Sequence, residues 1–307
     1  MKVLITGSNG FIGSNLTNHL KQAYTVISQG RIGTNVSNNI DFFEVDISGK
    51  SQWNSCLSGV NTIVHLAAVA HNNSIDLDLI HEVNVKGTIN LAQQAVDNGV
   101  KRFVFISSIG VLGNRTYGKP FDELSITAPH SEYAASKLQA ETELLKIAHN
   151  TGLEVVIIRP VLVYGAGAPG NFGKLVRLVQ KMPFLPFALC KNKRSFVSVD
   201  NLVDFISTCI VHPKAKNEIF CISDVDDVSI YELTNRIAKG LSTSLLQLPI
   251  PIFMFKLVGV LTGKSEMIDQ LIGDLQVDSH KAKELLNWTP SVSMADTFNQ
   301  LTKTNKI

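Results

Sequence analysis

Short apolar runs alternate with amphipathic stretches along the first half of the chain. Runs rich in β-branched and aromatic residues predict strands at residues 1–5, 24–27, 42–45, 62–66, 102–106 and 154–158. Helical spacing of apolar residues predicts helices at residues 11–20, 83–98 and 132–149. Such alternation is typical of a parallel sheet covered by helices on its faces. The pattern therefore predicts an α/β fold with a doubly wound parallel sheet.

Glycines fill the predicted turn between the first strand and the first helix. Gly7, Gly10 and Gly13 follow the apolar run 1–5 and surround the helix start at Phe11. Residues without a side chain let the backbone turn tightly and approach a pyrophosphate, whose charge is favoured by the amide groups at a helix start. The turn therefore predicts a dinucleotide site, with a plain structural turn as the alternative.

A tyrosine and a lysine one helical turn apart form the candidate catalytic pair. Tyr133 and Lys137 lie in the predicted helix 132–149, so their side chains share one face. A phenol with a pKa of about 10 is a poor base at neutral pH, and a nearby ammonium favours the phenolate. We expect Lys137 to lower the pKa of Tyr133, so that Tyr133 exchanges a proton with a hydroxyl group. The alternative is a packed aromatic beside a solvated amine.

Four motifs in order along the chain resemble those of the extended short-chain dehydrogenases/reductases, the group of nucleotide-sugar epimerases, dehydratases and reductases. They are residues 6–13, residues 65–68, the pair Ser107–Ser108 and the Tyr133/Lys137 pair, and the resemblance extends to about Pro290. It implies a Rossmann-like sheet with a smaller C-terminal substrate-binding lobe. It also implies that Ser108 hydrogen-bonds the reacting oxygen and that Lys137 holds the nicotinamide ribose.

The regular alternation ends at the Gly- and Pro-rich segment 164–170. We interpret residues 1–165 as the NAD(P)-binding domain and residues 166–307 as mainly the substrate-binding lobe. The resemblance implies that part of the second half returns to the first domain. The candidate returning segments are 196–199 and 218–222, within the region 196–222.

The resemblance implies NAD or NADP as the cofactor, and the end of the second strand bears on the choice. An acidic residue there would bind the ribose of NAD, but the sequence reads Ser28-Gln29-Gly30-Arg31. Arg31 can bind the 2′-phosphate of NADP, which favours NADP; a solvated loop arginine is the alternative. The resemblance implies further cofactor contacts at Phe11, Ile12, Asp46, Ile47, Leu66, Ala67, Ala68 and Pro160.

The residues after Ser108 bear on the reaction. The family's 4,6-dehydratases have an Asp-Glu pair there, whereas this chain has Ile109 and Gly110, so dehydration is not expected. Oxidation and reduction at C4 of a UDP-hexose or UDP-4-keto-hexose remain. Arg31 and Leu162, which replaces an Asn of the UDP-galactose epimerases, favour a 4-ketoreductase; a 4-epimerase that recycles NAD is the alternative.

The substrate's diphosphate is expected at Arg194, which resembles the family's diphosphate-binding arginine, with Asn171 as a further substrate contact. A surface arginine and a helix cap are the respective alternatives. Gln270 lies where a second family arginine is expected. Arg194 argues against a dehydrogenase of apolar alcohols. A non-catalytic dinucleotide-sensing regulator, the alternative from another class, usually lacks the tyrosine and the lysine.

Composition excludes several other classes of function. With 28 basic and 26 acidic residues and no basic run, nucleic acid is not an expected partner. The four cysteines have no metal-ligand spacing, so no metal is expected. A strand at residue 1 leaves no room for a secretory signal, so we expect a cytoplasmic location. Residues 248–261 are shorter than the roughly 20 needed for a membrane span, and we interpret them as a buried or interface helix. The resemblance implies a possible homodimer through helices 83–98 and 132–149.

Overall fold

The computed structural model describes residues 1–33, 41–69 and 76–301. Its central sheet has seven strands, all paired in parallel. In spatial order they are β10 (Ile219–Ile222), β6 (Glu154–Pro160), β5 (Arg102–Ile106), β4 (Thr62–His65), β1 (Lys2–Thr6), β2 (Thr25–Gly30) and β3 (Asp41–Glu44). The strand order reverses at β1, which confirms the doubly wound, Rossmann-like sheet.

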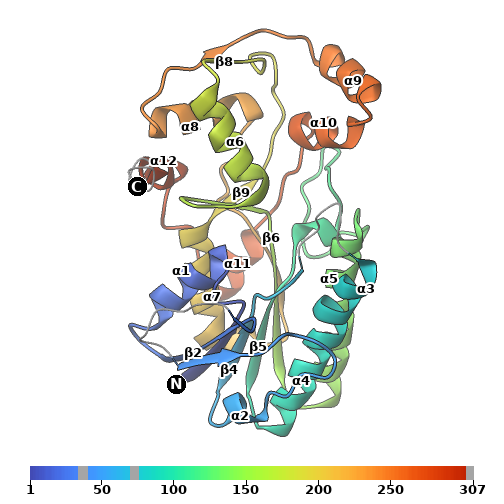
Figure 1. Cartoon of the computed structure of the whole chain (residues 1–307), viewed down its shortest axis with the longest axis vertical. Helices are drawn as coiled ribbons and strands as arrows, with labels where there is room; N and C mark the ends of the chain where they lie inside the picture. Colours follow the sequence, from blue (N-terminus) through green and yellow to red (C-terminus); the bar gives the residue numbers. More distant parts are fainter. Residues whose placement is uncertain (34–40, 70–75, 302–307) are drawn as a thin grey trace.

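Helices cover both faces of the sheet, in a three-layer arrangement (Figure 1). Alternate residues of β1 point to opposite faces: Val3 and Ile5 belong to one core cluster and Leu4 to the other. The first face is covered by α1 (Phe11–Leu20), α7 (Val199–Val211) and α11 (His280–Leu286). The second face is covered by α2 (Asn54–Leu57), α4 (Thr88–Asp97) and α5 (Glu132–Asn150).

The expected helix 83–98 is built from several segments. A short helix α3 (Leu77–His81) runs into a π-helical stretch, Glu82–Gly87, before α4 begins at Thr88. Two 3₁₀ turns, Ile109–Val111 and Pro213–Ala215, complete the first lobe. The sequence therefore located this helical region, but its periodicity did not reveal the change of helix type.

The second lobe surrounds a third core cluster that includes Phe172, Ile237 and Phe298. Its helices are α6 (Gly170–Lys181), α8 (Ile230–Gly240), α9 (Ile252–Leu261), α10 (Ser265–Ile272) and α12 (Met294–Asn299). Its strands β8 (Phe184–Leu185) and β11 (Leu246–Gln247) form a two-stranded sheet. Residues 302–307 of the predicted lobe lie outside the described part.

The chain returns to the first lobe, but only one expected segment reaches the central sheet. That segment is β10, which pairs with β6. The other contains β9 (Phe196–Ser198), which pairs instead with β7 (Leu162–Tyr164) in a sheet of their own. α7 follows directly and packs on α1 and the first face of the sheet. Residues 196–199 therefore return to the first lobe without joining its central sheet: Val197 and Val199 belong to the core cluster on the first face.

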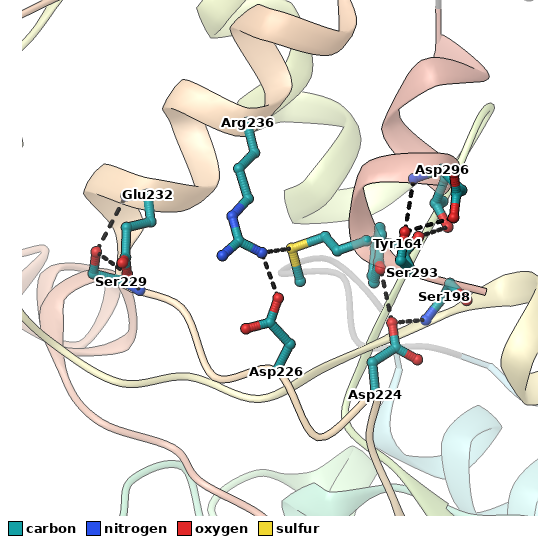
Figure 2. A network of polar contacts seen from close by, with 11 residues as sticks. Tyr164, Ser198, Asp224, Asp226, Ser229, Glu232, Arg236, Ser293 and Asp296 are labelled. Atoms are coloured by element: carbon teal, nitrogen blue, oxygen red, sulfur yellow. Dashed lines mark hydrogen bonds and ion pairs between the residues drawn. The ribbon is translucent and has the colours of Figure 1, made fainter. Parts of the chain in front are cut away.

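A polar network around Asp224 connects these returning segments (Figure 2). The Asp224 carboxylate accepts hydrogen bonds from Tyr164 Oη at 2.7 Å, from Asn201 Nδ2 at 2.7 Å and from the Ser198 amide at 3.0 Å. Asn201 Nδ2 also donates to the Val292 carbonyl at 2.8 Å. The partly buried Asp224 carboxylate thus links β7, β9 and α7, and Asn201 extends the network to the segment before α12.

Titration of Asp224 is expected to affect stability. Burial raises the pKa of its carboxyl to about 6, against the hydrogen bonds that lower it. Because the folded-state pKa is raised, Asp224 contributes less to the free energy of unfolding as the pH rises from about 4 to about 6. The difference in that free energy, wild type minus Asp224→Asn, should fall by about 2–3 kcal/mol between pH 4 and pH 7. Urea unfolding of both proteins across this range measures it, and a difference independent of pH would contradict the assignment.

Candidate active site

A cavity of about 490 Å³ lies beyond the carboxyl ends of the central strands and is lined by both lobes. This is where ligands bind in doubly wound sheets. The first lobe contributes the glycine turn, the segment after β5 and the start of α5, including Ser108, Tyr133 and Lys137. The second lobe contributes Arg194 and Gln270. The predicted dinucleotide turn and catalytic pair therefore face one space.

The glycine turn has the geometry of a pyrophosphate cradle. Gly7 has a φ of +68°, and a Cβ there would lie 2.9 Å from the Ala67 backbone. Gly10 is the N-cap of α1 and makes no side-chain cap to the amides of the first turn. Ser107 Oγ, which is buried in the same cavity, has no hydrogen-bond partner in the described structure. Open amides and an unpartnered hydroxyl fit a dinucleotide at this place.

Gln29 lies at the end of β2, where an acidic residue would bind the ribose of NAD. Its side chain instead supports the glycine turn. Its side chain is buried; Oε1 accepts from the Gly7 amide at 3.0 Å and Nε2 donates to the Val45 carbonyl at 2.7 Å. The Ser8 amide and hydroxyl both donate to the Gln29 carbonyl. Gln29 therefore holds the shape of the glycine turn, a role that its position at the end of a strand did not reveal.

His65 supports the opposite side of the turn. Thr88 Oγ1 donates to the Asn84 carbonyl, so it accepts from His65 Nε2 at 2.9 Å. Nδ1 then accepts from Thr6 Oγ1 at 2.7 Å, and Thr6 Oγ1 accepts from the Ala67 amide at 3.4 Å. Burial lowers the pKa of His65 to about 3, so the ring is neutral at pH 7. His65, the first residue of the motif 65–68, thus positions the Ala67 backbone, which lies beside Gly7.

Tyr133, Lys137 and Ser108 all line the cavity. The N-cap Ser131 accepts from the Ala134 amide at 3.2 Å and starts α5 beside the segment that follows β5. Lys137 is buried; its Nζ donates to the Ile106 carbonyl at 2.8 Å and lies 5.9 Å from the centroid of the Tyr133 ring. Ser108 Oγ accepts from the Gly110 amide at 3.1 Å, which leaves its own hydrogen free to be donated.

Burial dominates the acid–base properties of this pair. It raises the pKa of Tyr133 to about 12 and lowers the pKa of Lys137 to about 7. The expectation that Lys137 lowers the pKa of Tyr133 is therefore wrong for the protein alone. The reason is that Lys137 Nζ is bonded to the Ile106 carbonyl, and the desolvation of the phenolate outweighs any attraction.

A buried ion pair lies behind Lys137, and the sequence analysis missed it. Glu141 is one helical turn beyond Lys137, and Arg159 Nε and Nη2 donate to its two oxygens at 3.0 and 2.6 Å. Both side chains are almost fully buried. The Glu141 charge raises the pKa of Lys137 against the effect of burial. The signal was the spacing of Tyr133, Lys137 and Glu141, each one turn further along a single helix face.

The cavity favours anionic ligands. Arg194 Nη1 donates to the Gly273 carbonyl at 3.1 Å, and burial lowers the pKa of the guanidinium to about 10, so it stays charged at pH 7. None of the described residues that line the cavity carries a carboxylate. A Cβ at Gly110 would lie 3.0 Å from the His130 ring, and Ile109 is buried in the core, so an Asp-Glu pair after Ser108 would be crowded.

The structure divides the predicted ligand contacts into two groups. Those in the cavity lining are Gly7, Gly10, Phe11, Ile12, Gly13, Leu66, Ser108, Tyr133, Lys137, Pro160 and Arg194. Those outside it are Arg31, Asp46, Ile47, Ala67, Ala68 and Asn171. Arg31 and Asp46 are exposed, Ile47 is buried in the core, and Asn171 is exposed at the start of α6. The ligand roles of both groups stay predictions.

Known proteins resemble the chain over most of its length. Residues 3–223 match the model of the NAD dependent epimerase/dehydratase family. A UDP-glucose 4-epimerase of Vibrio cholerae is 45% identical over 306 residues, covering 97% of this chain and 93% of that protein. An N-acetyl-α-D-glucosaminyl-diphospho-ditrans,octacis-undecaprenol 4-epimerase of Escherichia coli O157:H7 is 28% identical, covering 88% of this chain and 83% of that protein.

A solved structure has the same fold. The UDP-glucose 4-epimerase of Thermotoga maritima, determined with UDP-glucose, superposes with a TM-score of 0.79. The two sequences are 23% identical, and the match covers 99% of this chain and 98% of that one. The likeness extends through both lobes, so the second lobe is part of the shared architecture.

Proposed function

The chain belongs to the NAD dependent epimerase/dehydratase family, and on that premise we propose that it is a 4-epimerase of a UDP-hexose. The observation that carries the proposal is the cavity in which Ser108, Tyr133 and Lys137 meet the cationic Arg194, with no carboxylate among its described lining residues. Such a site can exchange a proton with a sugar hydroxyl and hold an anionic substrate. The Vibrio cholerae relative supports epimerisation as the overall reaction.

The roles of the residues follow from their positions. Tyr133 Oη accepts the proton of the C4 hydroxyl and later returns it, while the Ser108 hydroxyl donates to the same oxygen. In the protein alone, burial of the phenolate is not offset. Positive charge must therefore offset it in the ligand-bound state, and we assign this role to Lys137, which lies on the same helix face. Arg194 pairs with the substrate diphosphate. When bound at the glycine turn, a nicotinamide dinucleotide supplies the acceptor for the C4 hydride and the donor that returns it.

Epimerisation and net reduction use the same residues, and the relatives favour epimerisation. The sequence analysis favoured a 4-ketoreductase because of Arg31 and Leu162. Arg31 is exposed and lies outside the cavity lining, so its role toward NADP stays a prediction. The matching family is described as NAD dependent, so we propose NAD as the cofactor. Leu162 does line the cavity, where it contributes an apolar side chain.

A second candidate substrate carries its hexose on a lipid diphosphate instead of a nucleotide. The Escherichia coli relative bears the name of an epimerase of such a compound. In this chain, α10 lines the cavity through Gln270 and directly follows α9, whose side chains are largely apolar and exposed. Both substrates present a hexosyl diphosphate to Arg194, so the site chemistry is the same for the two.

The proposed function is tested by incubating the purified protein with UDP-galactose or UDP-glucose and a catalytic amount of NAD. We expect the two sugars to reach the same equilibrium mixture from either side, measured by chromatography, without net consumption of the cofactor. UDP-N-acetylhexosamines and a polyprenyl-diphosphate-linked hexose, tested in parallel, identify the preferred substrate. Stoichiometric oxidation of NADPH by a UDP-4-keto-sugar, with no interconversion of any 4-epimer pair, would instead establish a ketoreductase.

A further inference from the structure

Helix α9 exposes an unusual number of large apolar side chains. Of its ten residues, Phe255 and Gly259 are buried, whereas Phe253, Val260 and Leu261 have 68%, 70% and 75% of their surface exposed. The other exposed apolar residues of α9 are Ile252, Met254, Leu257 and Val258, and Met267 adds to them from α10. Of the two interpretations of residues 248–261, a buried or an interface helix, the buried one is therefore wrong for α9.

The exposed apolar surface wraps most of the helix. With about 100° between successive residues, the positions from Ile252 round to Val258 span roughly 240° of the helix circumference. Phe255 and Gly259 fill the remaining arc, which packs against the lobe. A packed protein surface usually covers a narrower stripe of a helix. An acyl-chain environment, by contrast, can surround such a helix on all of its free sides.

The position of α9 and the charges near it also fit a lipid surface. Figure 1 shows α9 at the outer corner of the second lobe, away from the central sheet. In α9 and its flanking loops, residues 241–265, the charged residues are Lys256 and Lys264, both exposed, and Glu266 and Asp269 follow in α10. A lysine can extend its amine past apolar neighbours to the level of lipid phosphates. The segment thus combines apolar side chains with positive charge, as anionic membrane surfaces require.

We propose that α9 docks the protein on the surface of an anionic lipid bilayer. No helix in the described ranges has the length and apolar character to cross a membrane. A ten-residue helix is about 15 Å long, half of the roughly 30 Å hydrocarbon core, so α9 lies in the interface of one leaflet. α10 connects this helix to the cavity through Gln270, so docking brings the active site close to the membrane.

Membrane docking goes beyond the proposed function and is measured without any substrate. The full chain is mixed with vesicles of phosphatidylcholine alone or with an equal part of phosphatidylglycerol, and the bound fraction is determined by co-sedimentation. We expect binding to the anionic vesicles, weaker binding to the neutral ones, and weakening by salt. The Phe253→Ser/Leu257→Ser variant should partition at least about tenfold less, because two inserted side chains are lost. Lys256→Glu should remove most of the preference for phosphatidylglycerol.

Leu124→Ser/Ile126→Ser is the matched control, since it removes two comparably exposed apolar side chains far from α9 in sequence. Its vesicle binding should stay within about twofold of the wild type. The variant Phe253→Trp reports insertion directly, because the native Trp53 and Trp288 are buried. Its fluorescence should be quenched by brominated acyl chains.

Two results would overturn the proposal. The first is no binding to either kind of vesicle. The second is equal binding of the wild type and the Phe253→Ser/Leu257→Ser variant. Light scattering identifies the competing occupant: a wild-type dimer that this variant converts to monomers, without vesicle binding, would assign α9 to a second copy of the chain. Epimerase activity is assayed separately with UDP-sugars, so its loss or presence does not affect this test.

Discussion

Replacement of Tyr133 by phenylalanine is expected to lower kcat by about 10²–10⁴-fold, the usual contribution of a general acid–base group. The phenylalanine ring keeps the packing against Lys137 and the start of α5, and only the hydroxyl is lost. That hydroxyl makes no hydrogen bond within the described structure, so its removal leaves no partner unsatisfied. The affinity for NAD should therefore change by less than about threefold, since the lost hydroxyl acts in proton transfer and not in cofactor binding.

The measurement combines turnover of the 4-epimer pair with NAD binding by calorimetry. Tyr231→Phe is the matched control, because it removes a phenol hydroxyl from α8, outside the cavity lining. It should retain the wild-type kcat. A Tyr133→Phe variant with more than about a tenth of the wild-type kcat would show that another group moves the proton. His130, whose ring also lines the cavity, would then be the next residue to replace.

Local patterns in the sequence predicted the parts of the fold that depend on neighbouring residues. The short apolar run of β1 and the glycines before α1 are set by backbone geometry within a few positions. The same holds for Tyr133 and Lys137, which share a helix face and reach the cavity together. Such features are readable because the chain itself sets their spacing.

The rest of the site depends on contacts between distant segments. Gln29 supports Gly7 across 22 positions, and Thr6 meets His65 across 59. The helical spacing places Glu141 on the face of Lys137, but its partner Arg159 lies on a different element, so the spacing does not identify the ion pair. Only packing shows which side chains lose their water. For that reason the sequence placed Lys137 near Tyr133 correctly but gave the wrong sign for the resulting pKa.

Exposure is the other property that local patterns did not supply. Residues 252–261 are apolar enough to suggest a buried helix, and hydrophobicity alone cannot distinguish burial in protein from contact with lipid. The structure shows that this helix is mostly exposed, because Phe255 and Gly259 are its buried residues. The packing of neighbouring elements therefore has to be known before α9 can be assigned to the surface.

Replacement of Gly13 by alanine is expected to abolish dinucleotide binding, with at least about a 100-fold loss of affinity, and to lower the free energy of unfolding by about 2–4 kcal/mol. A Cβ at this position would lie 2.2 Å from the Gly7 carbonyl oxygen and 2.8 Å from Ser8 Cα. Neither can move freely, because the Gly7 and Ser8 amides are both hydrogen-bonded to Gln29. The added methyl group must therefore displace α1 or break the bonds that shape the turn.

Gly152→Ala separates this effect from the general cost of replacing a glycine. Gly152 has no atom within 4 Å of a built Cβ and no positive φ, so this change should alter the free energy of unfolding by less than about 1 kcal/mol and leave NAD affinity intact. Urea unfolding and calorimetric titration with NAD compare the two variants. If Gly13→Ala bound NAD as the wild type does, the close packing of α1 against Gly7 would not be needed to hold the cofactor. The cavity would then bind it through the α5 residues and Arg194 instead.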